Sequence, residues 1–290
     1  QLSFLKAGLV YSNHITTVSP NYAKEIQQAE LGFGLQGLLT ARNDNLTGIL
    51  NGIDTDEWNP ASDKFMRQAY SIHDLSGKAA NKALLQYRMR LKVDSDVPLL
   101  GVVSRFTHQK GLDLLLEIAP QLVELPVQIV MLGSGDAAMQ QAALDLSLSH
   151  PNKIGVHIGF SEALSHLIEA GADMFVMPSR FEPCGLNQLY SQRYGTPPIV
   201  HATGGLADSV VDCTEATLKD GSASGFAYNG MTADNLFATI QRAVKLYHKQ
   251  SQWQALQKNC MAKNFSWEVS AEAYRAVYLK VLGKPDVSPP

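Results

Sequence analysis

Residues 179–190 have the sequence Ser-Arg-Phe-Glu-Pro-Cys-Gly-Leu-Asn-Gln-Leu-Tyr and contain a single carboxylate, Glu182, directly after an apolar run. A carboxylate between Phe and Pro is partly desolvated unless hydrogen-bond donors compensate its charge, and sugar hydroxyls are donors of that kind. No second carboxylate follows nearby, as a glycosidase would require. Two interpretations remain: Glu182 holds a sugar, or it pairs with Arg180 or with a helix N-terminus.

Two cations, Arg105 and Lys110, flank a turn that opens a predicted helix. Two cations and the backbone N–H groups of such a turn can converge on a phosphate. Either residue alone is better explained as a solvated surface charge. The pair, beside two glycine-rich turns, favours a phosphate site.

The glycine-rich turns contain Gly133 and Gly135 in the first and Thr203, Gly204 and Gly205 in the second. The first is close to the dinucleotide fingerprint, but that fingerprint needs an acidic residue about 20 positions further on, at the end of the next strand, and none is present there. We therefore interpret the first turn as one that lets a nucleotide approach the backbone, although a plain strand-to-helix turn explains it equally well. The second either offers two amides to an anion or is an ordinary glycine turn.

Phe160 follows a predicted strand, where a ring stacks on a base or packs in the core, and core packing is the commoner role of a single Phe. Cys184 is interpreted as a small packed residue because no His lies near it in the sequence. Together with Cys213 and Cys260 it shows no metal-ligand spacing. We therefore expect free thiols, a reducing compartment and no metal site.

Composition excludes several classes of function. With 290 residues and 45% apolar content, the chain can form one large domain or two smaller ones. A net charge of -3 without a long basic run predicts neither nucleic acid nor an anionic membrane as a partner. No apolar stretch approaches the roughly 18 residues of a membrane span, and the N-terminus lacks a signal-peptide pattern. We expect a soluble intracellular protein that binds a small molecule or a neutral polymer.

The elements that must position these residues are short β-rich apolar runs that alternate with amphipathic helical segments. The predicted strands are 99–103, 127–132, 154–158, 173–177, 199–201 and 225–228. Between the first two, apolar residues recur at helical spacing from Leu112 to Val123, and Pro126 ends that helix. The pattern predicts an α/β fold with a doubly wound parallel sheet. Ligands of such sheets bind beyond the carboxyl ends of the strands, where the residues described above lie.

With these residues in place, the chain resembles the bacterial glycogen synthases and plant starch synthases, which are retaining glucosyltransferases of the GT-B fold. The resemblance covers nearly the whole chain and rests on a specific set of segments in a specific order. These are KAGLV at 6–10, ITTVSPNYAKEI at 15–26, NGID at 51–54, WNP at 58–60, KAANK at 78–82, SRFTHQKG at 104–111, PSRFEPCGLNQLY at 178–190, TGGLAD at 203–208 and FSWE at 265–268.

The resemblance implies roles for the site residues on both sides of an ADP-glucose donor. Arg105 and Lys110 would hold its pyrophosphate, together with the backbone amides of Leu186 and Asn187. On the sugar side, the glucosyl hydroxyls would be held by Glu182. The remaining contacts implied are the backbone of Cys184 and Gly185 with the sugar, and the ring of Phe160, where the family commonly has Tyr, with the adenine.

One position departs from the wider GT-B pattern, which often has a second glutamate eight residues after the first. Tyr190 stands there, which favours ADP-glucose over UDP-sugars. The implied reaction transfers glucose to the non-reducing end of an α-1,4-glucan with retention, through a front-face displacement without a metal. Arg105 and Lys110 would stabilise the departing ADP, and Glu182 would orient the sugar.

The resemblance also implies a division of the chain, whose first residue is Gln1 rather than Met. The expected parts are the end of the N-terminal GT-B domain (1–50), a hinge (51–60), the nucleotide-sugar-binding domain (61–265), a helix that crosses back (266–282) and a tail (283–290). We expect the rest of the N-terminal domain, with the acceptor-side residues, to be missing, and a cytoplasmic location, or a plastid one in a plant. Alternatives are a fragment that binds ADP or ADP-glucose without transfer and a UDP-glucose-dependent relative. A dehydrogenase is a further alternative, although the absence of the acidic residue that would bind the ribose argues against it.

Overall fold

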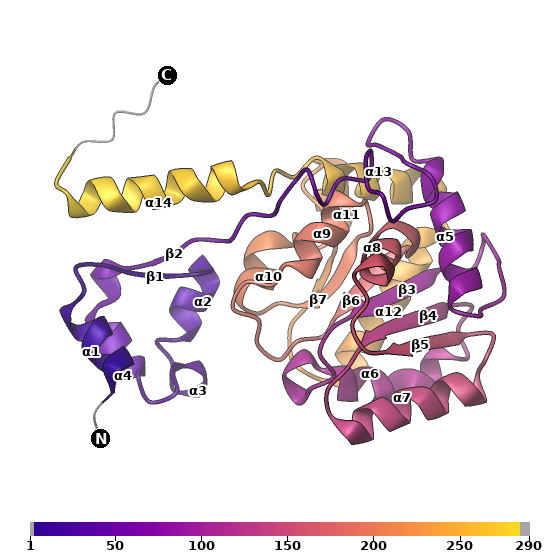
Figure 1. Cartoon of the computed structure of the whole chain (residues 1–290), viewed down its shortest axis with the longest axis horizontal. Coiled ribbons are helices and arrows are strands. Elements are labelled where there is room, and N and C mark those ends of the chain that lie inside the picture. Colours follow the sequence, from indigo (N-terminus) through magenta and orange to yellow (C-terminus); the bar gives the residue numbers. More distant parts are fainter. Residues whose placement is uncertain (1–2, 285–290) are drawn as a thin grey trace.

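The computed structural model describes residues 3–284 and contains two separate sheets (Figure 1). The larger sheet has six strands, all parallel, in the order β5-β4-β3-β6-β7-β8. Its strands are β3 (Leu99–Val103), β4 (Gln128–Gly133), β5 (Ile154–Ile158), β6 (Met174–Met177), β7 (Pro198–His201) and β8 (Phe226–Tyr228). The chain thus winds outward from β3 in one direction and from β6 in the other, as doubly wound sheets do.

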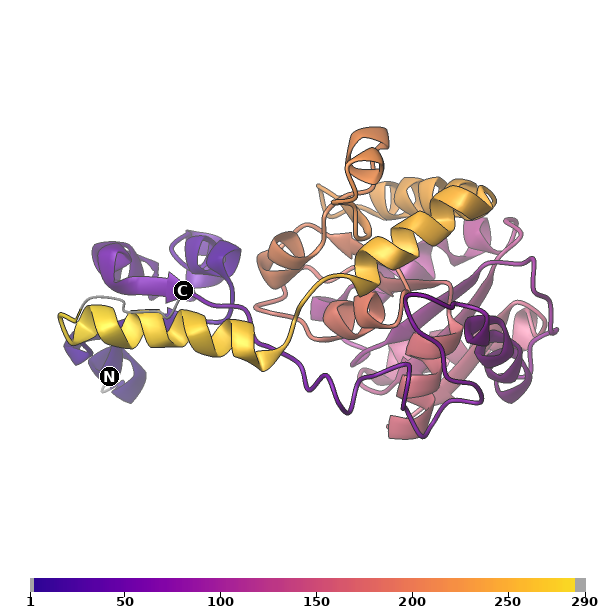
Figure 2. The same ribbon diagram turned by 90° about the horizontal axis from the view of Figure 1, so that it is seen from above.

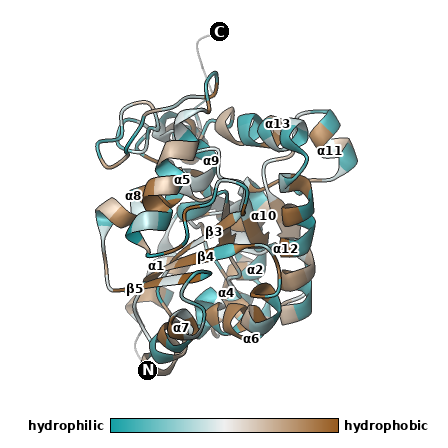
Figure 3. Cartoon of the chain, turned by 90° about the vertical axis from the view of Figure 1, so that its right-hand side faces the viewer, coloured by the Kyte–Doolittle hydropathy of each residue, from teal (hydrophilic) through white to brown (hydrophobic). Residues whose placement is uncertain are grey.

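All six strands expected from the sequence are present, and their bounds differ by at most one residue from those predicted. The agreement follows from burial, because β4 and β6 are buried at every position and therefore have continuous apolar runs. Figure 3 shows hydrophobic colouring in the part of the sheet where β3 and β4 are labelled. The helix predicted before Pro126 is also present, and it ends at Leu122.

Helices cover both faces of this sheet (Figure 1). On one face, α6 and α12 pack on Leu100 and Val102, and on the other, α5 and α8 pack on Leu99 and Val130, so alternate strand residues serve two apolar layers. The helices of this part are α5 (Gly77–Arg88), α6 (Leu112–Leu122), α7 (Ala137–Ser149), α8 (Glu162–Gly171), α9 (Asn187–Arg193), α10 (Gly204–Ser209), α11 (Glu215–Lys219), α12 (Ala233–Tyr247) and α13 (Gln250–Met261), with the 3-10 turn η2 (His108–Lys110).

Residues 3–50 form a smaller unit around a two-stranded parallel sheet, β1 with β2. Its elements are α1 (Phe4–Tyr11), β1 (Ile15–Thr17), α2 (Pro20–Glu25), α3 (Ala29–Gly32), α4 (Gln36–Ala41), the 3-10 turn η1 (Asn43–Asn45) and β2 (Leu46–Gly48). The last helix, α14 (Trp267–Val281), lies along this unit (Figure 2). Its Ser270 hydroxyl donates to the Leu50 carbonyl at 2.6 Å, and Lys280 Nζ donates to the Asp44 carbonyl at 3.2 Å.

The two units are joined by residues 51–76, which are largely irregular and run beside the segment before α14. The N-terminal unit and the sheet domain are also in direct contact, because α2 packs on α10. Among the described residues, no helix is long and apolar enough to cross a membrane.

Candidate functional site

Six of the thirteen predicted site residues meet in one cavity of about 240 Å³, at the point where the winding direction of the sheet reverses between β3 and β6. We call it the switch-point cavity. It is lined by Val103, Ser104, Arg105, Lys110, Val176, Met177, Pro178, Ser179, Glu182, Gly185, Leu186 and Asn187. Six of these were singled out from the sequence, and they come from the two loops that follow β3 and β6.

Glu182 forms an ion pair with Lys110, and both side chains are largely withdrawn from solvent. The Ser179 hydroxyl donates to the same oxygen, Oε2, at 3.1 Å. No described residue forms a hydrogen bond with the other oxygen of Glu182, Oε1. This atom is also absent from the set of fully buried polar atoms that lack a partner, so it is not fully buried. The carboxylate therefore has one oxygen fixed by the protein and one left for another donor.

Arg180 does not pair with Glu182, so that alternative from the sequence is wrong. Its guanidinium instead binds both oxygens of Asp113, at 2.7 and 2.6 Å. Burial acts to raise the pKa of Asp113, but the hydrogen bonds and charge of Arg180 hold it below its ordinary value. Arg180 lies in the loop after β6 and Asp113 in the first turn of α6, so their pairing fixes that loop against the start of α6.

The two loops approach each other closely because Gly111 has no side chain. Its φ is +69°, and a Cβ there would collide with the carbonyl oxygen of Pro178. The Arg180 amide donates to the Gln109 carbonyl at 2.8 Å, which ties the loops together on the same side. Lys110, between Gln109 and Gly111, is therefore held where its side chain reaches Glu182.

Arg105 is exposed at the rim of the cavity, and the one hydrogen bond of its side chain to a described residue is a long contact of 3.4 Å to Gln109 Oε1. Across the cavity, no hydrogen bond from the amides of Leu186 and Asn187 to described residues is found, as is usual for the first amides of a helix. The Asn187 side chain donates to the Val103 carbonyl at 2.7 Å, so it anchors α9 rather than facing a ligand.

The turn at Thr203, Gly204 and Gly205 lies outside the cavity lining. The anion that this turn binds in the structure is the chain's own Glu25 carboxylate, at the end of α2. It accepts hydrogen bonds from the Gly204 amide at 2.8 Å and from the Thr203 hydroxyl at 3.0 Å. Cβ atoms at the two glycines would collide with the carbonyl oxygens of Glu182 and Cys184. The glycines therefore support the backbone of the site from behind.

Gly133 and Gly135 also lie outside the cavity lining. Cβ atoms there would collide with the carbonyl oxygens of Ser104 and Phe106, so these glycines bring the end of β4 against the loop that carries Arg105. The close approach that they permit is to the chain's own backbone. This matches the plain turn that we considered from the sequence.

Phe160 is 90% exposed, so of the two interpretations from the sequence core packing is wrong, and stacking on a base stays a prediction. It follows β5 at the carboxyl edge of the sheet. Cys184 is buried, as predicted, and burial raises the pKa of its thiol. The amide of Asn51 points at Cys184 Sγ, at 3.4 Å. All three cysteines are free, as expected.

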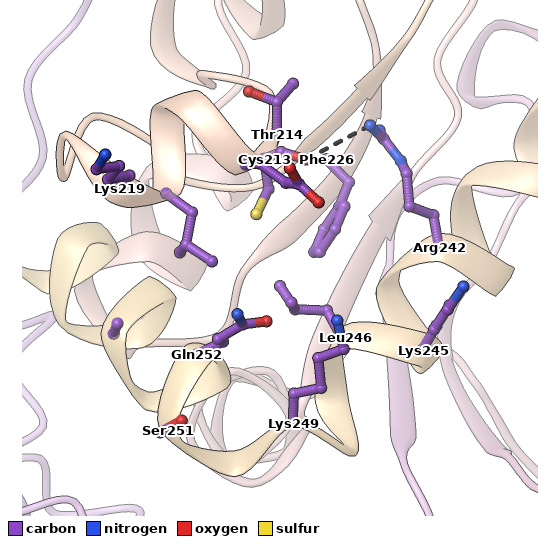
Figure 4. A pocket seen from close by; sticks show the side chains of 13 residues that line it. Cys213, Thr214, Lys219, Phe226, Arg242, Lys245, Leu246, Lys249, Ser251 and Gln252 are labelled. Carbon is purple, nitrogen blue, oxygen red and sulfur yellow. Dashed lines mark hydrogen bonds between the residues drawn. The ribbon is translucent and has the colours of Figure 1, made fainter.

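A larger pocket, of about 730 Å³, lies between α11, α12 and α13 (Figure 4). None of the predicted site residues lines it. Of its cations, Arg242 is already engaged by both oxygens of Asp212, at 2.8 and 2.6 Å. The candidate site is therefore the smaller cavity at the switch point.

Residues 86–259, more than half of the chain, match the family of glycosyl transferases group 1. The chain belongs to this family. Residues 1–41 also match the starch synthase catalytic domain. Group 1 membership agrees with the parallel six-stranded sheet, and the doubly wound α/β class predicted from the sequence is confirmed.

This group 1 glycosyltransferase chain is similar to glycogen synthases of Nitrosomonas eutropha, at 58% identity over 98% of the chain, and Nitrosospira multiformis, at 56% identity over 98%. It covers 56% and 57% of those proteins. The catalytic domain of starch synthase IV from Arabidopsis thaliana, bound to ADP and acarbose, superimposes with a TM-score of 0.90 at 37% identity, covering 97% of this chain and 58% of that one. The family resemblance and the GT-B fold expected from the sequence are confirmed.

Proposed function

We propose that the protein is a glycogen or starch synthase that transfers glucose from ADP-glucose to the non-reducing end of an α-1,4-glucan with retention. This chain supplies the donor-binding residues. The observation that carries the proposal is the switch-point cavity, where Arg105, Lys110 and Glu182 converge at the carboxyl ends of β3 and β6. The similarity to glycogen synthases over 98% of the chain supports it.

The phosphate side of the proposed site consists of Arg105, Lys110 and the amides of Leu186 and Asn187. Cations and unpaired amides fixed before the reaction stabilise the charge that develops on the departing ADP, at little cost in reorganisation. Lys110 would then exchange part of its interaction with Glu182 for the pyrophosphate. Arg105, exposed at the rim, is free to close over it.

The sugar side rests on Glu182, whose unpartnered Oε1 suits a glucosyl hydroxyl. Its negative charge also stabilises the positive charge of an oxocarbenium-like transition state. No second carboxylate lines the cavity, so we propose a front-face displacement in which the leaving phosphate takes the acceptor proton. Cys184 and Gly185 would contribute backbone contacts to the sugar.

The adenosine would lie outside the cavity, because about 240 Å³ is below the roughly 300–1,000 Å³ of pockets that enclose a drug-sized ligand. We propose that it extends over the strand ends toward Phe160, whose exposed ring can stack on adenine. Gly133 and Gly135 lie at the end of β4, the strand next to β5. In this scheme neither a cofactor nor a metal takes part in transfer, and the protein works in the cytoplasm.

The proposal is tested by calorimetric titration of the chain with ADP-glucose, with UDP-glucose and NADH as comparison ligands. ADP-glucose should bind most tightly, and Arg105→Ala should weaken it at least tenfold, whereas Arg88→Ala, an exposed Arg on α5, should leave it unchanged. Stronger binding of UDP-glucose or NADH would contradict the donor assignment. A transfer assay with a maltooligosaccharide acceptor then separates transferase activity from donor binding without transfer.

A further inference from the structure

Three potential metal ligands meet outside the switch-point cavity: Glu57, Glu162 and His166. One ligand atom from each lies within 4.8 Å of the other two. Glu162 is the first residue of α8, and His166 lies about one turn later on the same face. Glu57 comes from the irregular segment that joins the two units. A cavity of about 160 Å³ adjoins Glu57 and His166.

The imidazole of His166 is held in one orientation by its neighbours. Its Nδ1 lies 2.8 Å from Oδ2 of Asp63, and the Tyr194 hydroxyl donates to the same oxygen at 2.6 Å. Trp58 stacks on the ring, with the centroids 3.8 Å apart and the planes at 11°. A carboxylate on one imidazole nitrogen, which fixes the tautomer and leaves the other nitrogen as a ligand, is the usual second shell of a metal-binding His.

The other nitrogen of His166, Nε2, is buried and has no hydrogen-bond partner, although the residue is only 1% exposed. With the proton on Nδ1, shared with Asp63, Nε2 keeps a lone pair, and a ring nitrogen of His166 lies within 4.8 Å of a carboxylate oxygen of Glu57 and of Glu162. Two carboxylates and an imidazole gather there, no described residue donates a hydrogen bond to Nε2, and a cation satisfies all three groups. The lysine that lines this cavity, Lys64, instead places its Nζ over the ring of Phe65, 4.9 Å from the ring centroid.

We propose that Glu57, Glu162 and His166 bind a zinc ion, with water completing its coordination. One imidazole with carboxylates is a ligand set that zinc accepts, and imidazole favours zinc over magnesium or calcium. Because the ligands come from the joining segment and from α8, the ion would fasten that segment to the sheet domain. This site is independent of the proposed transfer chemistry, since none of the three residues lines the switch-point cavity.

The test is calorimetric titration of the chelator-treated chain with zinc chloride, with the bound metal counted by elemental analysis. We expect one zinc ion per chain and at least a tenfold loss of affinity in Glu57→Gln and Glu162→Gln. Both residues are exposed, so neither change threatens folding. Glu215→Gln is the matched control, because Glu215 is likewise the exposed first residue of a helix, and it should bind zinc as the unmodified chain does.

Cobalt substitution distinguishes this site from the three thiols. Cobalt bound by nitrogen and oxygen gives weak visible bands without the intense near-ultraviolet charge-transfer band of a cobalt thiolate, and these bands should disappear in Glu162→Gln. Zinc should also raise the melting temperature of the chain but not that of Glu162→Gln. Failure to bind zinc, equal binding by a Glu57→Gln/Glu162→Gln double variant, a thiolate band, or tighter binding of magnesium than of zinc would each overturn the proposal.

Discussion

Lys110 and Glu182 form an ion pair in the switch-point cavity although 72 positions separate them in the sequence. One residue follows β3 and the other follows β6, and these strands are neighbours only because the winding of the sheet reverses between them. The pair is thus a direct consequence of topology. It places a cation and a carboxylate at the point where doubly wound sheets bind their ligands.

Glu182→Gln should lower the affinity for ADP-glucose without lowering the affinity for ADP. The variant keeps the shape of the side chain but loses the charge that strengthens a hydrogen bond from a sugar hydroxyl, an interaction of about 1.5–3 kcal/mol, or roughly 10- to 150-fold in affinity. Calorimetric titration with both ligands measures the difference. Glu117→Gln, an exposed Glu on α6, is the control.

Lys110→Ala gives the complementary result, because it removes a phosphate ligand. We expect ADP and ADP-glucose to be weakened by similar factors. If Glu182→Gln weakened both ligands equally, or Lys110→Ala weakened neither, the division of the cavity into a sugar side and a phosphate side would be wrong.

The sequence predicted the sheet and the edge where the site lies, but it predicted few of the pairings within the site. Continuous apolar runs mark buried strands, and the residue after each run must lie at the carboxyl edge. The partner of Glu182 was missed because Arg180 is close in sequence, whereas Lys110 is close only in space. The local sequence alone favoured core packing for Phe160, because single phenylalanines usually pack there, whereas the family resemblance implied an exposed ring for stacking, and the ring is exposed.

Glu25 was not singled out as a site residue, although the segment that contains it carried part of the family resemblance. Its role depends on the contact between α2 and α10, which joins positions about 180 residues apart. Ser179, which donates to Glu182, was quoted within its segment but given no role. Such residues are found only from the three-dimensional structure, because side-chain types and local spacing do not show which distant residues come into contact.

Glu25→Ala should destabilise the packing of the first 50 residues on the sheet domain. The carboxylate caps the first amide of α10 and binds the Thr203 hydroxyl, and loss of a comparable cap costs about 0.5–2 kcal/mol. Chemical denaturation measures the change, with Glu30→Ala, an exposed residue of α3, as the control. A change equal to that of the control would show that the capping contact contributes no stability.

Gly111→Ala should lower the free energy of unfolding by more than the roughly 1–3 kcal/mol of a strained backbone conformation. The added Cβ meets both an unfavourable φ of +69° and the Pro178 carbonyl. Gly8→Ala is a control of opposite sign, because a Cβ there meets no atom within 4 Å and Ala is favoured over Gly inside a helix by about 0.5–1 kcal/mol. Urea denaturation measures both. A neutral Gly111→Ala would mean that the loops after β3 and β6 need not approach as closely as observed.

Lys78 should make the stability of the chain rise with pH above about 8. Burial lowers the pKa of its ammonium group to about 8 in the folded chain, from 10.5. Between these values the unfolded chain holds the proton and the folded chain does not, so the free energy of unfolding rises by up to about 1.4 kcal/mol per pH unit. The thiol of Cys213 acts in the opposite direction, because burial raises its pKa from 9.0 to about 11.

The contribution of Lys78 is therefore isolated by comparing pH slopes rather than stabilities. Lys78→Met also loses hydrogen bonds to Ala170 and Thr196, but that loss shifts the whole curve, whereas the proton linkage changes only its slope. Urea unfolding at several pH values from 7.5 to 10 should show a less positive slope in Lys78→Met than in the unmodified chain. Parallel curves would mean that Lys78 keeps its ordinary pKa, and hence that water reaches its ammonium group in the folded state.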